Sequence, residues 1–245
     1  MKPTHLVKAP IVEAVVEFRV SPTTVWEPKR LKDALIKSLP FYQKIEEGKE
    51  FVYSLSLEGA QPKQEELGCV GYKLTSDDGR YVVQFNKQAF VFSQVKDYKD
   101  WECLSDNAKQ LWSIYCALLK PQKVKRIGVR FINHMRILSK SFSLASYFVN
   151  PPEEKQVEGW DLGRFIHHDV LAVPNTSYFV NLMKTVIPPT GENLGKVVLD
   201  IDVSLDKDVE CAWEKLDSHL LEMREIKNKA FFENIAEGRI GEYLK

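Results

Sequence analysis

The feature that most constrains the fold is the alternation of apolar and basic side chains along Lys123–Ile137. Every second residue from Ile127 onward is apolar except for one asparagine: Ile127, Val129, Phe131, Asn133, Met135 and Ile137. The residues between them include Arg126, Arg130, His134 and Arg136. Successive side chains of a strand point to opposite faces, so this period of two predicts a strand half-buried in an antiparallel sheet. One face of the strand packs on the core, and the other is basic.

Composition and charge narrow the class of protein. Hydrophobic residues make up 44% and charged residues 28% of the 245 residues, as in ordinary globular proteins. The formal net charge of +0 lacks the positive excess of a general nucleic-acid binder. The charge is nevertheless uneven, because residues 107–152 contain no Asp or Glu. This segment carries Lys109, Lys120, Lys123, Lys125, Arg126, Arg130, Arg136 and Lys140. The sequence therefore predicts a local basic patch.

The cysteines and the apolar segments indicate the compartment. Cys69, Cys103, Cys116 and Cys211 lie far apart and form no CxxC pair, which favours reduced thiols in the core. The first residues, MKPTHLVKAP, have no apolar segment typical of a signal peptide. No apolar run is long enough for a membrane-spanning helix. We expect a soluble cytoplasmic protein.

The first half of the chain shows the element order β-α-β-β-β-β-α. The Asp77-Asp78-Gly79 turn between alternating segments is a strong hairpin signal, and Pro28 is placed to open a helix. Glu58–Leu67 is polar and is predicted to be a loop. The expected elements are a strand at Ile11–Val20, a helix from Pro28 to Leu39, a meander of about four strands over residues 50–95, and a helix at Lys99–Leu119. In the first strand we expect Val12, Ala14, Val16, Phe18 and Val20 to share the buried face.

The second half repeats this order less clearly. It is predicted to contain a short helix at Ser141–Phe148, a loop at Asn150–Gly159, and strands at Asp161–Val173, Thr176–Ile187 and Lys196–Leu205. A long helix follows from Asp208 to about Ile235, with Asp206 as its N-cap.

This order predicts an α+β fold made of two pseudo-duplicated β-α-β(3-4)-α units, residues 1–122 and residues 123–245. The second unit ends in the long C-terminal helix, residues 208–235. Both units would share one antiparallel sheet with all helices on one face, as in TATA-binding-protein or helix-grip folds. The strands Ile11–Val20 and Lys123–Ile137 would then occupy equivalent positions in the two units.

Motifs for common cofactor chemistries are missing from the sequence. His167 and His168 are adjacent, so in a strand they point to opposite faces, and His5, His134 and His219 have no nearby partner. There is no HExxH, no glycine-rich phosphate loop and no GxSxG elbow. We therefore expect neither a metal site nor a bound cofactor.

One group of charged residues could form a site if the strands Ile11–Val20 and Lys123–Ile137, which open the two units, are neighbours. Glu13, Glu17 and Arg19 would then share the sheet face away from the helices with Arg126, Arg130, His134 and Arg136. Three interpretations stay open. The charges can form a ladder of exposed ion pairs, each contributing ~0.2–1 kcal/mol. They can bind an anionic or peptide ligand, since guanidinium groups suit carboxylate and phosphate. A catalytic acid–base pair is the third.

Four pieces of the sequence together resemble a known family. They are APIVEA at Ala9–Ala14, VVQFNKQAFVFSQVKDY at Val82–Tyr98, RIGVRFINHM at Arg126–Met135, and the tail around His219 and Phe231-Phe232. The chain resembles a sporadically distributed bacterial family of uncharacterised proteins of about 250 residues, which open with "API-EAV" and carry a central "R-[YF]-I-N". Glu13, Arg130 and Asn133 match these motifs. The resemblance spans nearly the whole chain and implies a bacterial protein with the patchy distribution of defence and toxin–antitoxin genes, but no activity.

The sequence thus favours a non-enzymatic accessory or regulatory protein that binds a partner protein, plausibly the product of a neighbouring gene. The predicted binding residues are Arg126, Arg130, His134, Arg136, Glu13 and Glu17. The long C-terminal helix is also a candidate surface for a homo-oligomer. One alternative is binding of nucleic acid or an anionic ligand through the basic face, as a TATA-binding-type saddle does on DNA. A second alternative is an enzyme with a Glu/Arg site.

Overall fold

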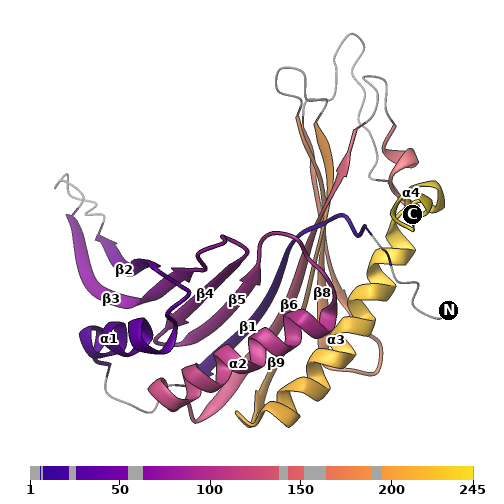
Figure 1. The fold of residues 1–245 in the computed structure, drawn as a ribbon. Helices are drawn as coiled ribbons and strands as arrows, with labels where there is room; N and C mark the ends of the chain where they lie inside the picture. Colours follow the sequence, from indigo (N-terminus) through magenta and orange to yellow (C-terminus); the bar gives the residue numbers. More distant parts are fainter. Residues whose placement is uncertain are drawn as a thin grey trace.

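The computed structural model describes residues 6, 8–21, 26–54, 63–137, 143–151, 164–188 and 195–244. These residues form one nine-stranded antiparallel sheet in the order β2-β3-β4-β5-β1-β6-β9-β8-β7. Helices α1, α2 and α3 lie on the same face of this sheet (Figure 1). The predicted α+β fold, with a single antiparallel sheet and a long C-terminal helix, is confirmed. None of the described helices is long and apolar enough to span a bilayer.

The elements alternate as follows. The strands are β1 (Ile11–Ser21), β2 (Lys44–Ser54), β3 (Lys63–Thr75), β4 (Tyr81–Asn86), β5 (Ala89–Gln94), β6 (Lys123–Arg136), β7 (Ile166–Ala172), β8 (Tyr178–Ile187) and β9 (Lys196–Val209). The helices are α1 (Pro28–Ser38), α2 (Trp101–Leu119), α3 (Trp213–Asn234) and α4 (Glu237–Tyr243), with one 3-10 turn, η1 (Leu144–Ser146).

The two unit-opening strands lie side by side at the centre of the sheet. β1 pairs antiparallel with β6, and each also pairs with the last strand of its own half of the chain, β1 with β5 and β6 with β9. Each half of the chain thus supplies one side of the sheet. The division into two units, residues 1–122 and 123–245, stays a prediction. Buried residues of both halves belong to one hydrophobic core.

The core lies between the helix-covered face of the sheet and helices α1, α2 and α3. The odd-numbered residues of β6 from Ile127 to Met135 are buried there, as the alternation predicts. Aromatic rings fill the centre of the first half, where Trp112 of α2 lies 4.9 Å from Phe18 and 5.5 Å from Phe90 between ring centroids. Offset and edge-to-face ring pairs of this kind contribute beyond their buried area. They fix α2 on the sheet.

The long helix begins later than predicted. α3 starts at Trp213, whereas Asp206 and Asp208 belong to β9, so the predicted Asp206 cap and the Asp208 start are wrong. Both aspartates reach the lysines and arginines of β6: Asp208 binds Lys125 at 2.9 Å, and Asp206 lies 3.7 Å from Arg126. These cross-strand pairs extend β9 to Val209, which faces Val124.

The edge of the sheet formed by β2 and β3 also differs from the prediction. β2 begins at Lys44 rather than at Glu50, and β3 already begins at Lys63, inside the predicted loop Glu58–Leu67. Residues 55–62 lie outside the described part of the chain. β2 is an edge strand, and its described residues before position 50 are largely exposed, so backbone pairing with β3 defines it where hydrophobic periodicity is weak.

Two other segments deviate. Of the predicted helix Ser141–Phe148, only the 3-10 turn η1 is present among the described residues, and residues 138–142 fall outside them. In β1, the pairing with β6 shifts register between Ile11 and Glu13. This bulge exchanges two side chains. Ile11 packs against the core, whereas Val12, predicted to be buried, is 36% exposed.

Candidate functional site

The even-numbered side chains of β6 lie on the face of the sheet opposite to α1, α2 and α3, hereafter the outer face. Arg126, Arg130, His134 and Arg136 are partly or largely exposed, whereas Ile127, Val129, Phe131, Asn133 and Met135 between them are buried. The face is therefore the one predicted from the alternation. The neighbours of these residues decide what the face can bind.

Arg126 sits between carboxylates from both neighbouring strands. Its Nη1 donates to Glu17 of β1 at 2.8 Å, its Nη2 donates to Asp202 of β9 at 3.5 Å, and its Nε lies 3.7 Å from Asp206. The side chain is only 16% exposed. A Cβ atom at Gly128 would lie 2.9 Å from Arg126 Nη1, so only glycine leaves room for the guanidinium in this position.

Arg130, further along β6, binds a third carboxylate of β9. Its Nε donates to both oxygens of Asp200, at 2.9 and 3.1 Å, and its Nη2 donates to the same carboxylate. The Asp200 side chain is 6% exposed, whereas that of Arg130 is 46% exposed. Hydrogen bonding to Asp200 raises the pKa of Arg130. The pair is thus a charge-assisted, bidentate contact in which the carboxylate is the buried partner.

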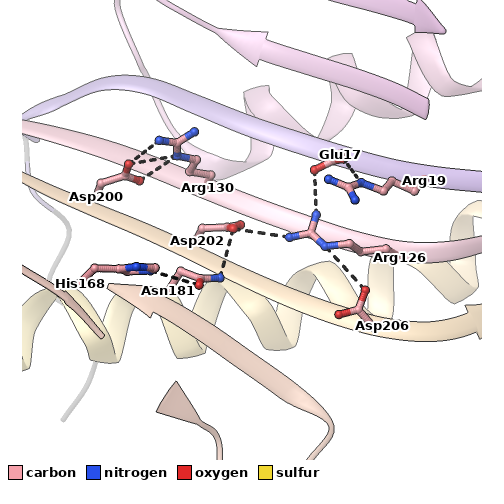
Figure 2. A network of polar contacts seen from close by, with 9 residues as sticks. All are labelled: Glu17, Arg19, Arg126, Arg130, His168, Asn181, Asp200, Asp202 and Asp206. Atoms are coloured by element: carbon pink, nitrogen blue, oxygen red, sulfur yellow. Dashed lines mark hydrogen bonds and ion pairs between the residues drawn. The ribbon is translucent and has the colours of Figure 1, made fainter. Parts of the chain in front are cut away.

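The network continues across the outer face, as Figure 2 shows. Glu17 also accepts from Arg19 Nε at 2.6 Å, Asn181 of β8 donates to Asp202 at 3.4 Å, and His168 of β7 meets Asn181 at 3.3 Å. Burial raises the pKa of Asp202 although Arg126 and Arg130 act in the opposite direction.

Carboxylates outnumber guanidinium groups by one in this network. It contains three guanidinium groups, on Arg19, Arg126 and Arg130, against four carboxylates, on Glu17, Asp200, Asp202 and Asp206. The middle of the outer face is therefore not basic. Of the predicted set, Glu13 is partly buried, and its side chain makes no hydrogen bond or ion pair with the described residues.

His134 and Arg136 belong to a different part of the outer face, at the end of β6. They line a hollow of ≈590 Å³, hereafter the basic hollow, whose wall is completed by Lys8, Pro10, Val12, Lys196, Glu242 and Tyr243. Lys8, Arg136 and Lys196 form no ion pair with any described residue, and Glu242 is engaged by Arg239 at 2.8 Å. Burial and Lys196 lower the pKa of His134. Three cations without an ion pair to a described residue therefore gather at this hollow.

Apolar side chains are exposed on the same face, toward the β7 edge. Ile166, Val170, Phe179 and Ile187 are 69%, 61%, 43% and 40% exposed. Ile187 is directly opposite Lys196 of the basic hollow in the β8–β9 pairing, so the apolar side chains continue from the hollow to the edge of the sheet. A surface of this mixed composition resembles a protein interface more than an enzyme cleft.

Other chemistries lack a site in the described part of the chain. No cluster of three or more His, Cys, Asp or Glu side chains able to hold a metal occurs there. The four cysteines are free, and burial raises the pKa of Cys116 to about 12 and also that of Cys211. Such thiols are poor nucleophiles, because the thiolate is the reactive form.

The sequence pattern did not reveal the carboxylates that pair with the β6 arginines or the lysines that extend the basic hollow. Asp200, Asp202 and Asp206 were not paired with β6, and Lys8 and Lys196 were not placed beside Arg136. A signal was present: in a pseudo-duplicated fold the hairpin-linked last strand of each half is expected beside its first strand, which puts the β9 aspartates next to the β6 arginines.

Comparisons with known proteins add no assignment to this geometry. No protein-family model matches the chain, and no match is found among the curated proteins.

Proposed function

We propose that this protein is a non-enzymatic binding module that holds a partner protein on its outer face. The observation that carries the proposal is the basic hollow, where Lys8, Arg136 and Lys196 lack ion-pair partners among the described residues while the neighbouring arginines are neutralised. An acidic side chain or chain end of the partner would enter the hollow. The exposed apolar side chains of β7 and β8 would be covered at the same time.

The resemblance to the bacterial family suggests where the partner comes from. We propose a cytoplasmic regulatory or accessory role in which the partner is the product of a neighbouring gene, in a defence or toxin–antitoxin setting. A homo-oligomer formed through α3 is the competing arrangement. The apolar stripe of α3 does not face outward for such an interface, because Leu216, Leu220 and Met223 are buried against the sheet.

Nucleic-acid binding is the second candidate, because the basic hollow also suits phosphate. Three unpaired cations would neutralise about three phosphates and give a shallow salt dependence, with affinity in the non-specific range of about 10⁻⁴ to 10⁻⁶ M. The arginines of the network beside the hollow are paired with carboxylates, so they add no further phosphate contacts. An acid–base enzyme has less support, since the Glu17 carboxylate already binds Arg19 and Arg126.

A matched pair of double variants tests the proposal. Arg136→Ala with Lys196→Ala removes two unpaired cations of the basic hollow. Lys123→Ala with Lys125→Ala removes two cations from the other end of β6, where both lie within ion-pair distance of Asp208 at 3.5 and 2.9 Å. The wild type and both double variants serve as baits for affinity capture from the source cells, and the captured proteins are quantified by mass spectrometry. Calorimetry then measures the affinity of each bait for the purified captured protein.

We expect the variant of the basic hollow, Arg136→Ala with Lys196→Ala, to bind the captured protein about tenfold or more weakly than the wild type. The control variant, Lys123→Ala with Lys125→Ala, should lose less than about threefold in affinity. Both variants should unfold within about 1 kcal/mol of the wild type, because exposed charges contribute little to stability. Equal losses in the two variants, or capture of nucleic acid that the hollow variant abolishes, would contradict the proposal.

A further inference from the structure

A second candidate site lies on the opposite, helix-covered side of the sheet. A cavity of ≈170 Å³ opens between the start of α2, the second half of α3 and the beginning of β1. Its wall includes Tyr98, Trp101, Asn133, Arg224, Lys227 and Phe231. This volume is large enough for several waters or one small organic molecule. None of these residues contributes to the outer face.

Phe131 of β6 forms the centre around which these side chains gather. The Tyr98 ring meets it edge-on with centroids 5.5 Å apart, the Trp101 ring is stacked at 6.4 Å, and the Nζ atom of Lys227 lies 4.2 Å from its centroid. Asn133 follows two residues later on the same face of β6. The cavity thus has aromatic walls and a cation beside them.

Lys227 is the feature that points to a ligand. The residue is 9% exposed, and its ammonium group makes no hydrogen bond or ion pair with any described residue. The contact with the Phe131 ring stabilises a cation only partly. Buried charges are ordinarily paired, because removal of an ion from water costs several kcal/mol. Desolvation by burial, followed by repulsion from Arg224, lowers the pKa of Lys227 to about 8.

The acids near the cavity are already engaged. Asp100 caps α2 by accepting from the Cys103 backbone N–H at 2.7 Å, and Glu102 binds Arg224 at 3.0 Å. Asn133 donates through Nδ2 to the carbonyls of Phe131 and Leu199, and its Oδ1 accepts no hydrogen bond from a described group. The cavity therefore offers one buried cation without an ion pair, Lys227, beside the exposed Lys99, and one free amide oxygen.

We propose that this cavity binds a small organic carboxylate with an apolar body, with the Lys227 ammonium group as the partner of the carboxylate. The aromatic walls would cover the apolar body, and Asn133 Oδ1 would accept from a hydroxyl or N–H group next to the carboxylate. A carboxylate would supply the counter-charge that Lys227 lacks, and charge-assisted hydrogen bonds of this kind are about twice as strong as neutral ones. The proposal is independent of partner binding on the outer face.

The test uses acids and their neutral counterparts. Acetate, butyrate and benzoate are titrated by calorimetry and ligand-detected NMR into the full-length protein, each beside its amide: acetamide, butyramide and benzamide. The same titrations are made on Lys227→Met and on the control Lys184→Met. Lys184 is 4% exposed and lies over the Phe148 ring at 5.1 Å, but its Nζ donates to the Asn150 carbonyl at 2.8 Å. It is a buried lysine that already has a partner.

We expect at least one of the acids to bind the wild type and its amide to bind at least about tenfold more weakly. Lys227→Met should lose about thirtyfold or more of the acid affinity, and Lys184→Met should retain it within about threefold. The comparison of acid with amide needs no variant, so it holds even where a variant folds poorly. Equal affinity for acid and amide, unchanged binding by Lys227→Met, or no binding of any acid at millimolar concentration would overturn the proposal.

Discussion

Lys227 shows how a single side chain can depart from the behaviour of its type. It sits on α3 and is 9% exposed, and its Nζ atom lies 4.2 Å from the centroid of the Phe131 ring without an ion pair to any described carboxylate. In the unfolded chain the amine has its ordinary pKa of 10.5, whereas in the folded protein the pKa is about 8. Between these values the unfolded state binds more protons, so the contribution of Lys227 to stability becomes more favourable as the pH rises.

This residue gives a prediction with a definite sign. Near pH 7 both states carry the charge and the folded state bears its full cost. We therefore expect Lys227→Met to be more stable than the wild type by up to about 3 kcal/mol. The difference should shrink as the pH rises from about 8 toward 10.5. Urea unfolding of both proteins at several pH values, without added carboxylate, measures it.

Lys229→Met is the matched control for that measurement. Lys229 lies one half-turn away on the same helix, and its side chain is 74% exposed with only a 3.9 Å contact to Glu233. Its replacement should change stability by less than about 0.5 kcal/mol at any of these pH values. A Lys227→Met protein that is less stable than the wild type near pH 7 would show that the lysine has a stabilising partner.

At the scale of elements, the β6–β9 pair shows what a sequence pattern can and cannot reveal. The alternation along β6 predicted the buried and exposed faces correctly, because it depends only on the local geometry of a strand. The charge of the exposed face depended on β9, which lies about 70 residues later in the sequence. Asp206 was predicted to cap a helix that starts at Asp208, since an aspartate before an amphipathic segment has that local signature. Their ion pairs with β6 are not visible locally.

The pairing of these two strands predicts a contrast between two ion pairs. Arg130→Ala should destabilise the protein by about 2 kcal/mol, because it leaves the Asp200 carboxylate, 6% exposed, without its partner. The figure is below that for a fully buried pair, since Arg130 is half exposed. Lys125→Ala, whose pair with Asp208 is exposed on both sides, should cost less than about 1 kcal/mol.

Chemical denaturation of the single variants measures this contrast. In the Arg130→Ala background, Asp200→Asn removes the stranded charge and should recover part of the lost stability. Equal destabilisation by Arg130→Ala and Lys125→Ala would contradict the assignment of Arg130 as a structural partner of Asp200. Arg130 would then be available for binding, as the sequence predicted.

At the scale of the whole molecule, each face of the sheet has its own chemistry. The helices cover one face and enclose the cavity around Lys227, and the other face carries the ion-pair network and the basic hollow. The element order, the hairpin at Asp77–Gly79 and the helices on one face were predictable, because turn residues and hydrophobic periods are local. The start of the edge strand β2 and the bulge at Ile11 were not, since backbone pairing with a neighbouring strand defines them.

The most direct test of the outer face as the docking surface is site-specific photo-crosslinking. A photoreactive amino acid replaces either Ile187, 40% exposed beside the basic hollow, or Leu221, 45% exposed on α3. The two positions are similarly accessible but belong to opposite faces of the molecule. If the partner docks on the outer face, we expect position 187 to crosslink to the partner protein and position 221 not to. Crosslinks from position 221 alone, to a partner or to a second copy of this chain, would contradict it.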